Sequence, residues 1–95
     1  MFKIVKDCLE DTDILCYSIP MVEIGTSEYK QMIEKFEAGQ QFKFRLLDDD
    51  KIVYFIGFSD DCTSEKAFDP LDMYGEAYGC TEIQYLNQEG QWETL

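Results

Sequence analysis

Alternating apolar and polar positions predict a pair of neighbouring strands in the middle of the chain. In residues 41–47, Phe42, Phe44 and Leu46 alternate with Lys43 and Arg45, as in a strand with one buried face. Residues 51–58 (KIVYFIGF) are apolar on both sides, as in an interior strand that is covered on both faces. We therefore expect the second strand to lie in the centre of a sheet.

The three aspartates at positions 48–50 predict a hairpin turn between these strands, because aspartate tolerates the left-handed backbone. A three-residue loop gives a continuous apolar face through the pairs Leu46 with Ile52, Phe44 with Tyr54 and Phe42 with Ile56. A slip of one residue instead sets the same three side chains against Val53, Phe55 and Gly57. The slip leaves a gap at Gly57, so the first register is favoured while both stay open.

One amphipathic helix is expected over residues 26–39. Its apolar residues Tyr29, Met32, Ile33 and Phe36 recur at i, i+3, i+4 and i+7, which places them on one face. Either Ser27 or Thr26 can cap its first amides, and Gly39 suits a left-handed residue after its last turn. In a small domain such a stripe is expected to pack against a sheet.

The remaining strands are expected near the two ends of the chain. Residues 2–6 and 13–19 resemble short strands, the second ended by Pro20, which lacks a donor for the ladder. Residues 81–86 and 91–95 form a predicted terminal hairpin, whose Ile83, Tyr85 and Trp92 are expected to share the core. The expected fold is α+β, a mainly antiparallel sheet of about five or six strands with one helix on a face, in a single domain over residues 1–95.

Charge is the strongest global feature, and it is unevenly distributed. Residues 1–47 hold 8 acids and 6 bases, a net −2, whereas residues 48–95 hold 12 acids and 2 bases, a net −10; together they give −12. This field repels nucleic acid and anionic membranes and attracts basic surfaces. We therefore expect no direct binding of nucleic acid or membrane, and a basic protein surface as the partner.

Targeting signals and cysteine chemistry favour a cytoplasmic chain with reduced thiols. No apolar stretch resembles an export signal or a membrane-spanning helix. The four cysteines have no C-x-x-C spacing; free thiols are the default, although the even number leaves a disulfide open.

Enzyme chemistry is disfavoured because the chain has no histidine. Ser-His, Cys-His and histidine–metal arrangements are thereby excluded, whereas paired carboxylates, as in glycoside hydrolysis or metal-assisted phosphoryl chemistry, remain possible. No calcium loop of the D-x-[DN]-x-[DN]-G type and no phosphate-binding glycine loop occurs. We expect no enzyme activity, no cofactor and no specific metal site.

Residues 59–80 (SDDCTSEKAFDPLDMYGEAYGC) are the most informative segment. A connection of this length in a small domain is usually functional or contains a short helix. Its acids alternate with Phe68, Tyr74 and Tyr78, a combination that can form a recognition surface. In the alternative interpretation, Phe68, Leu71 and the tyrosines only pin the segment onto the sheet while the acids are solvated.

Several segments resemble a pattern found in small acidic proteins of bacteria and mobile elements. The segments are FRLLDDD (44–50), AFDPLD (67–72), GCTEIQY (79–85) and GQWETL (90–95). In that pattern a glycine tends to follow the aspartates, where this chain has Lys51. The resemblance implies a bacterial or mobile-element setting and implies no activity, cofactor or catalytic residue.

Two function classes follow from these features. The first is a non-catalytic binding module whose acidic half docks on a basic protein surface, such as the groove of a nucleic-acid-binding protein; the second is a self-associating structural domain that its acidity keeps soluble. The residues expected to contact a partner are Asp48, Asp49, Asp50, Asp60, Asp61, Asp69, Asp72, Tyr74, Glu76 and Tyr78. The aspartates at 48–50 and those at 60–61 should lie at opposite ends of one strand, and the latter near Gly39.

Overall fold

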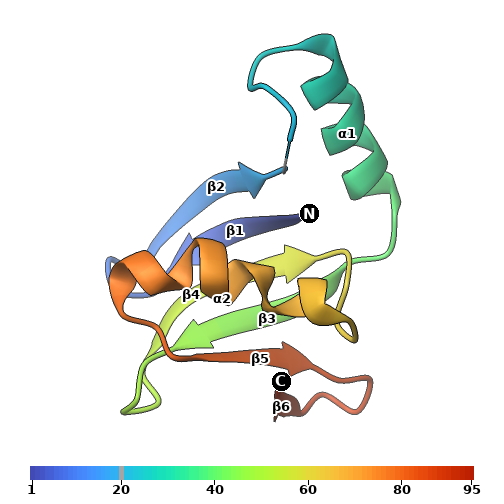
Figure 1. The fold of residues 1–95 in the computed structure, drawn as a ribbon. Coiled ribbons are helices and arrows are strands. Elements are labelled where there is room, and N and C mark those ends of the chain that lie inside the picture. The colour runs from blue at the N-terminus through green and yellow to red at the C-terminus, as the bar shows by residue number, and fades with distance from the viewer. Residues whose placement is uncertain (20) are drawn as a thin grey trace.

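The computed structural model describes residues 1–19 and 21–95 and has an α+β fold (Figure 1). One antiparallel sheet of six strands has the order β2-β1-β4-β3-β5-β6, so the predicted fold class is confirmed. The strands are β1 (Phe2–Asp7), β2 (Thr12–Ser18), β3 (Phe42–Leu47), β4 (Val53–Ser59), β5 (Glu82–Leu86) and β6 (Trp92–Thr94). The helices are α1 (Ser27–Ala38), η1 (Glu65–Phe68), α2 (Asp69–Met73) and η2 (Gly75–Tyr78).

Strand β4 lies between β1 and β3, as its two apolar faces predict. The proposed role of Pro20 in ending the second strand lies outside the described residues. Strand β2 ends at Ser18.

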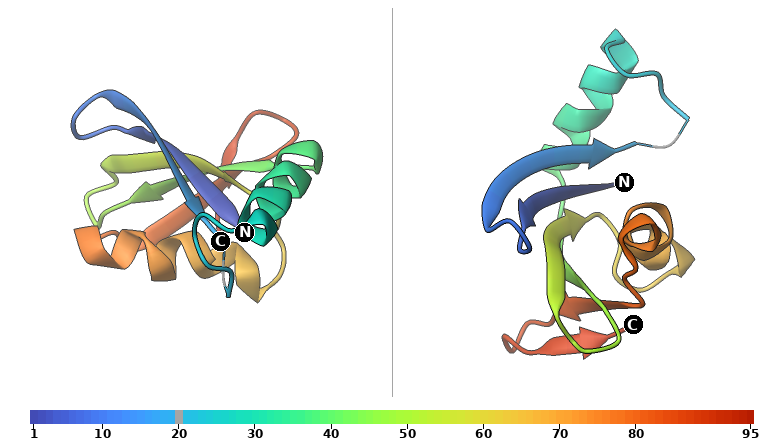
Figure 2. Two further views of the ribbon diagram at one scale, coloured as in Figure 1. Left: turned by 90° about the horizontal axis from the view of Figure 1, so that it is seen from above. Right: turned by 90° about the vertical axis from the view of Figure 1, so that its left-hand side faces the viewer.

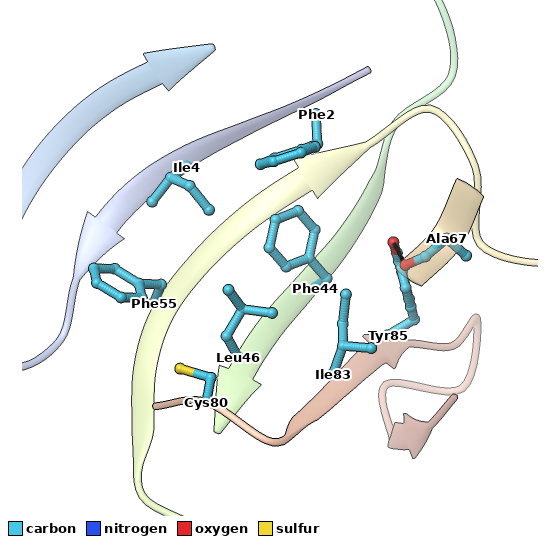
Figure 3. Close-up of a cluster of buried hydrophobic side chains, with 9 residues drawn as sticks. All are labelled: Phe2, Ile4, Phe44, Leu46, Phe55, Ala67, Cys80, Ile83 and Tyr85. Carbon is cyan, nitrogen blue, oxygen red and sulfur yellow. Dashed lines mark hydrogen bonds between the residues drawn. The ribbon is translucent and has the colours of Figure 1, made fainter. Parts of the chain in front are cut away.

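One face of the sheet is covered by residues 65–78, which we call the cover segment (Figure 2). The main core lies between this segment and the central strands, and Figure 3 shows its buried side chains. They are Phe2, Ile4, Phe44, Leu46, Phe55, Ala67, Cys80, Ile83 and Tyr85. The long connection predicted to be functional or to contain a short helix is therefore a layer of the fold in its own right.

The inner side of the cover segment is made of small and rigid residues. Ala67, Pro70 and Gly75 are buried, and the Tyr85 hydroxyl donates a hydrogen bond of 2.8 Å to the carbonyl of Ala67. Proline suits the first turn of α2, where its missing N–H would have no partner in the helix. These close contacts hold the segment flat against the sheet.

Helix α1 docks on the opposite, open face of the sheet by its last turn. Phe36 is only 3% exposed, and its ring lies edge-on to Tyr17 at 6.4 Å between centroids. Glu37 accepts hydrogen bonds from the Lys3 ammonium at 2.9 Å and from the Tyr17 hydroxyl at 2.6 Å. The other stripe residues, Tyr29, Met32 and Ile33, are only half-buried. The predicted amphipathic helix is confirmed, but one turn makes most of its contact.

The two ends of α1 differ from each other in how well the sequence predicts them. Thr26 rather than Ser27 is the N-cap, and its hydroxyl accepts from the Tyr29 amide at 3.1 Å. The expectation of a left-handed Gly39 is wrong, because its φ is −88° and its ψ is 179°. Its N–H reaches the carbonyls of Lys35 and Phe36 from this extended conformation.

Strands β3 and β4 pair in neither of the two predicted registers. Leu46 lies opposite Phe55, Phe44 opposite Gly57 and Phe42 opposite Ser59. The buried side of β4 is therefore Phe55, Gly57 and Ser59, and not the side that carries Ile52 and Ile56. Gly57 leaves no gap, because the ring of the fully buried Phe44 occupies the space that a Cβ would take.

The hairpin turn between these strands is longer than the three aspartates. It spans residues 48–52, with Asp48 N–H donating to Ile52 O and Lys51 N–H to Asp48 O, both at 3.1 Å. The left-handed residue is Lys51, with φ 65°, and not an aspartate. This is the position at which the resembling pattern tends to carry glycine. A bulge between Leu46 and Leu47 absorbs the difference in strand length.

The terminal hairpin of β5 and β6 forms as predicted, but one of its three expected core residues lies elsewhere. Ile83 and Tyr85 are buried in the core. Trp92 lies on the open face, where the Arg45 guanidinium stacks at 4.3 Å from its ring centroid. The correction follows from strand alternation, because Trp92 pairs with Leu86, which alternates with the buried Tyr85.

Substituting Gly57 by alanine should destabilise the domain by at least about 3 kcal/mol, at the upper end of the cost of overpacking a core. The new Cβ would lie 2.1 Å from the Lys3 carbonyl oxygen and 2.6 Å from Cζ of Phe44. Chemical denaturation measures the loss. Gly39→Ala is the control, because its Cβ would meet nothing closer than 3.4 Å and the stability should stay the same or rise slightly. Equal stabilities of the two variants would refute the close approach.

Lys51→Gly should be more stable than Lys51→Ala by about 1 kcal/mol, since only glycine adopts positive φ without steric cost. Both variants lose the ion pair between the Lys51 ammonium and Glu82, so their difference isolates the backbone term. The measurement is the free energy of unfolding of the pair. A more stable alanine variant would contradict a left-handed residue at this turn.

Candidate acidic docking surface

The outer side of the cover segment carries a row of carboxylates. We call Glu65, Asp69, Asp72 and Glu76 the acidic row. None of them belongs to the buried inner side of the segment, which is formed by Ala67, Pro70 and Gly75. Glu65, Asp72 and Glu76 are exposed and Asp69 is half-buried. The row thus faces solvent along the whole segment.

The two tyrosines of the segment have different positions. Tyr74 is half-buried, and its ring packs edge-on against Phe55 at 4.9 Å between centroids. Burial raises the pKa of Tyr74 to about 12, so its hydroxyl stays protonated at neutral pH. Tyr78 also contacts Phe55, at 4.8 Å, but half of it is exposed. Only Tyr78 therefore offers a partner a large part of its ring.

Asp61 is committed to the turn that leads into the cover segment. Its Oδ1 accepts hydrogen bonds of 2.9 Å from the amides of Thr63 and Ser64, and its Oδ2 accepts from the Ser64 hydroxyl. The Ser64 hydroxyl and these two amides lower the pKa of Asp61 to about 2. A carboxylate with this many internal donors orders the chain and has little capacity left for a partner.

Asp60 lies at the other side of the same turn, next to the end of α1. Its Oδ1 is 3.1 Å from the amino group of Met1. Asp60 also lines a cavity of about 260 Å³ together with Lys35 and Gly39. The prediction that this region returns near Gly39 is confirmed for Asp60, and the ammonium of Met1 offsets the unfavourable helix end.

The aspartates at 48–50 lie at the opposite end of β4 and have unequal roles. Asp48 Oδ1 accepts from the amides of Asp50 and Ile52 at 2.9 and 3.0 Å, and the Ile52 amide contributes most to lowering its pKa. Asp49 Oδ1 accepts from the Thr81 hydroxyl at 2.7 Å, and Asp50 is exposed. Asp48 thus holds the turn, while Asp49 and Asp50 face outward.

The contact between Asp49 and Thr81 links this turn to the residues that follow the cover segment, while Asp61 lies in the turn that precedes the segment. The two aspartate groups, which lie at opposite ends of β4 as predicted, are thus bridged by the acidic row between them. The result is one acidic surface along the covered side of the molecule.

A cleft of about 320 Å³ opens at one side of this surface, between the cover segment and strands β5 and β6. Phe68, Leu71 and Ile83 form apolar walls, and Asp49, Glu82 and Lys51 add charged groups. The Lys51 ammonium pairs with Glu82 and, together with Thr94, lowers the pKa of Glu82 to about 2. Asp49 is therefore the carboxylate left in the cleft to meet the cationic end of a side chain with an aliphatic stem.

The expected contact residues do not include three residues of this surface, Glu65, Phe68 and Glu82, although Phe68 and the acids of residues 59–80 belong to the combination that can form a recognition surface. The signal for Glu65 is its place among these acids. Phe68 and Glu82 meet only through the packing of the cover segment on β5, which no local pattern encodes.

Other chemistry is sparse in the described ranges, residues 1–19 and 21–95. No three side chains there converge as metal ligands would. The four cysteines are free thiols, and burial raises the pKa of Cys80 to about 11, so its thiol is unreactive. Within the same ranges, no helix has the length and apolarity to cross a bilayer.

Comparison with known proteins finds no match to a protein-family model, to a curated protein or to a solved structure. Function must therefore be inferred from the surface itself.

Asp61→Ala should lower the stability at neutral pH by about 1 kcal/mol, the usual net value of a hydrogen bond inside the protein, because the turn loses the acceptor of the Thr63 and Ser64 amides. Because folding lowers the pKa of Asp61 from 3.8 to about 2, its stabilisation is complete above pH 4 and is lost as the pH falls towards 2. Unfolding curves of both proteins from pH 7 to pH 2 should therefore converge at the acid end. Asp72→Ala, at an exposed position, is the control and should leave stability unchanged. A constant difference in stability between wild type and Asp61→Ala across this pH range would contradict the role of the ionised Asp61 in the turn.

Proposed function

We propose that the chain is a non-catalytic, cytoplasmic binding module that docks its acidic surface on a basic protein surface. The observation that carries the proposal is the acidic row on the exposed side of a segment whose other side is fixed in the core. Lys66 is the only base after Lys51, so the surface has little internal neutralisation. Arginine is the favoured partner residue, since its guanidinium pairs with carboxylates bidentately.

Preorganisation supports this function. The cover segment is held by Ala67, Pro70 and Gly75, so its carboxylates are positioned before a partner arrives. Binding then avoids most of the entropy that ordering a flexible acidic loop would cost. A rigid, charged surface also steers a basic partner during encounter and discriminates against acidic ones.

The spacing of the acidic row supports a groove that normally holds nucleic acid as the target. Successive carboxylates are three or four residues apart, which corresponds to an advance of roughly 4.5–8 Å in helices of 1.5–2.0 Å rise per residue. One strand of duplex DNA carries a charge about every 3.4 Å along the axis. The row is therefore within a factor of about two of that linear charge density.

The cleft beside Phe68 gives the surface an anchoring point. An arginine or lysine stem can pack on Phe68 and Leu71 while its charged end approaches Asp49. Contacts of this kind, an apolar pocket beside fixed charges, often dominate the affinity of an interface. The half-exposed Tyr78 adds contact area near the other end of the cover segment.

The test compares two variants of equal net charge. One reverses the acidic row to lysine at Glu65, Asp69, Asp72 and Glu76; the other reverses Glu10, Asp13, Glu23 and Glu89, all exposed and outside the cover segment. Wild type and both variants serve as baits in lysate of the native host, and retained proteins are eluted with rising salt. The expected result is a basic protein held by wild type and by the control variant.

With that protein purified, the row variant should bind at least tenfold more weakly, since charged contacts at an interface cost about 2 kcal/mol or more each when lost. Affinity of the wild type should fall as salt rises. Circular dichroism should show both variants folded, because the substituted side chains are mainly solvated. Equal binding by the row variant, or an affinity that ignores salt, would overturn the proposed function.

A further inference from the structure

The first two turns of α1 project beyond the sheet (Figures 1 and 2). Beside them lies a shallow cavity of about 490 Å³, walled by Tyr29 and Ile33 and, at the helix start, by Gly25 and Thr26. Ile24, next to this wall in the chain, is 81% exposed. An exposed isoleucine beside an apolar wall makes the start of α1 a candidate contact surface.

The charges around this cavity identify the kind of partner. Its lining contains one base, Lys30, and one acid, Glu34, so the surface is neutral in a chain of net charge −12. A strongly basic partner would gain more on the acidic surface than here. Two copies of net charge −12 repel each other at long range, but salt screens this repulsion beyond about 8 Å, so the local charges decide whether the two surfaces fit and the association is weak. A neutral surface with one charge of each sign suits a copy of itself.

We propose that two copies of the chain associate through their α1 helices, packed antiparallel about a two-fold axis. In an antiparallel pair centred near residue 32, position 30 of one helix meets position 34 of the other. Lys30 of each copy then faces Glu34 of the other, and the two ion pairs flank a contact between Ile33 side chains. The surface is self-complementary, as a two-fold interface requires.

The predicted association is weak and reversible. Helix α1 has 12 residues and is roughly 18 Å long, so the contact is smaller than the roughly 800 Å² per partner of a standard interface. The most acidic half of the chain stays away from it. Helix α1 docks on the open face of the sheet and the cover segment on the opposite face, so a dimer leaves both acidic surfaces free.

Sedimentation velocity over a range of concentrations tests the pairing, with two charge-reversal variants. Lys30→Glu carries two acids on this surface and Glu34→Lys carries two bases, so each variant should repel itself and sediment as an 11.1 kDa monomer. In an equimolar mixture, each acid of the first meets a base of the second. The mixture should therefore dimerise at least as well as the wild type. Each variant alone should associate with itself at least tenfold more weakly than the wild type does.

Each variant has the same helix stability alone and in the mixture. Dimers that form only in the mixture therefore cannot be explained by a change in the stability of the helix. Lys35→Glu is the control, since this residue lines the cavity near Asp60 instead and should not change wild-type association. Ile33→Glu should abolish dimers in every combination. A wild type that is monomeric at millimolar concentration, or variants that fail to complement each other, would overturn the proposal. It stands independently of the proposed basic partner.

Discussion

The close approach of Phe44 to Gly57 is the constraint on which the rest of the structure depends. The ring occupies the position of the absent Cβ, in the centre of the sheet and beneath the strand β1. That contact sets which residues of β3 and β4 face each other, and the register in turn makes the turn five residues long with Lys51 left-handed. It also turns Phe55 towards the cover segment, where Tyr74 and Tyr78 pack on it. The position of the acidic row therefore depends on the absence of a side chain at Gly57.

The strands and α1 could be predicted from the sequence, while the helices of the cover segment and the pairing of β3 with β4 could not. The alternation of apolar and polar residues predicts β3, and the apolar stripe at helical spacing predicts α1, because both patterns are local in the sequence. The register of β3 against β4 depends on three-dimensional fit at Gly57, where the absence of a side chain makes room for the ring of Phe44. Trp92 was misplaced for the same reason, since its face is set by pairing with Leu86.

The candidate site divides in a similar way. Charge counting located the acidic half of the chain, and the segment 59–80 was singled out by its length and composition. Hydrogen bonding then separates the acids into two kinds. Asp48 and Asp61 satisfy backbone amides and build turns, whereas the acidic row is solvated and available. Sequence cannot separate these roles, because the same residue type serves both.

The pairing of β1 with β4 has a consequence for synthesis of the chain. Phe2 lies opposite Ser59, so the partner of the first strand is made some fifty-seven residues later. On the ribosome, β1 and β2 can form a hairpin early, but the inner edge of β1 stays without its neighbour until β4 has emerged. Long-range pairings of this kind slow folding, because loop closure must precede the contacts that reward it. Residues 1–47, which are made before β4, have a net charge of only −2, so the acidity of the finished protein gives this unpaired edge little protection during synthesis.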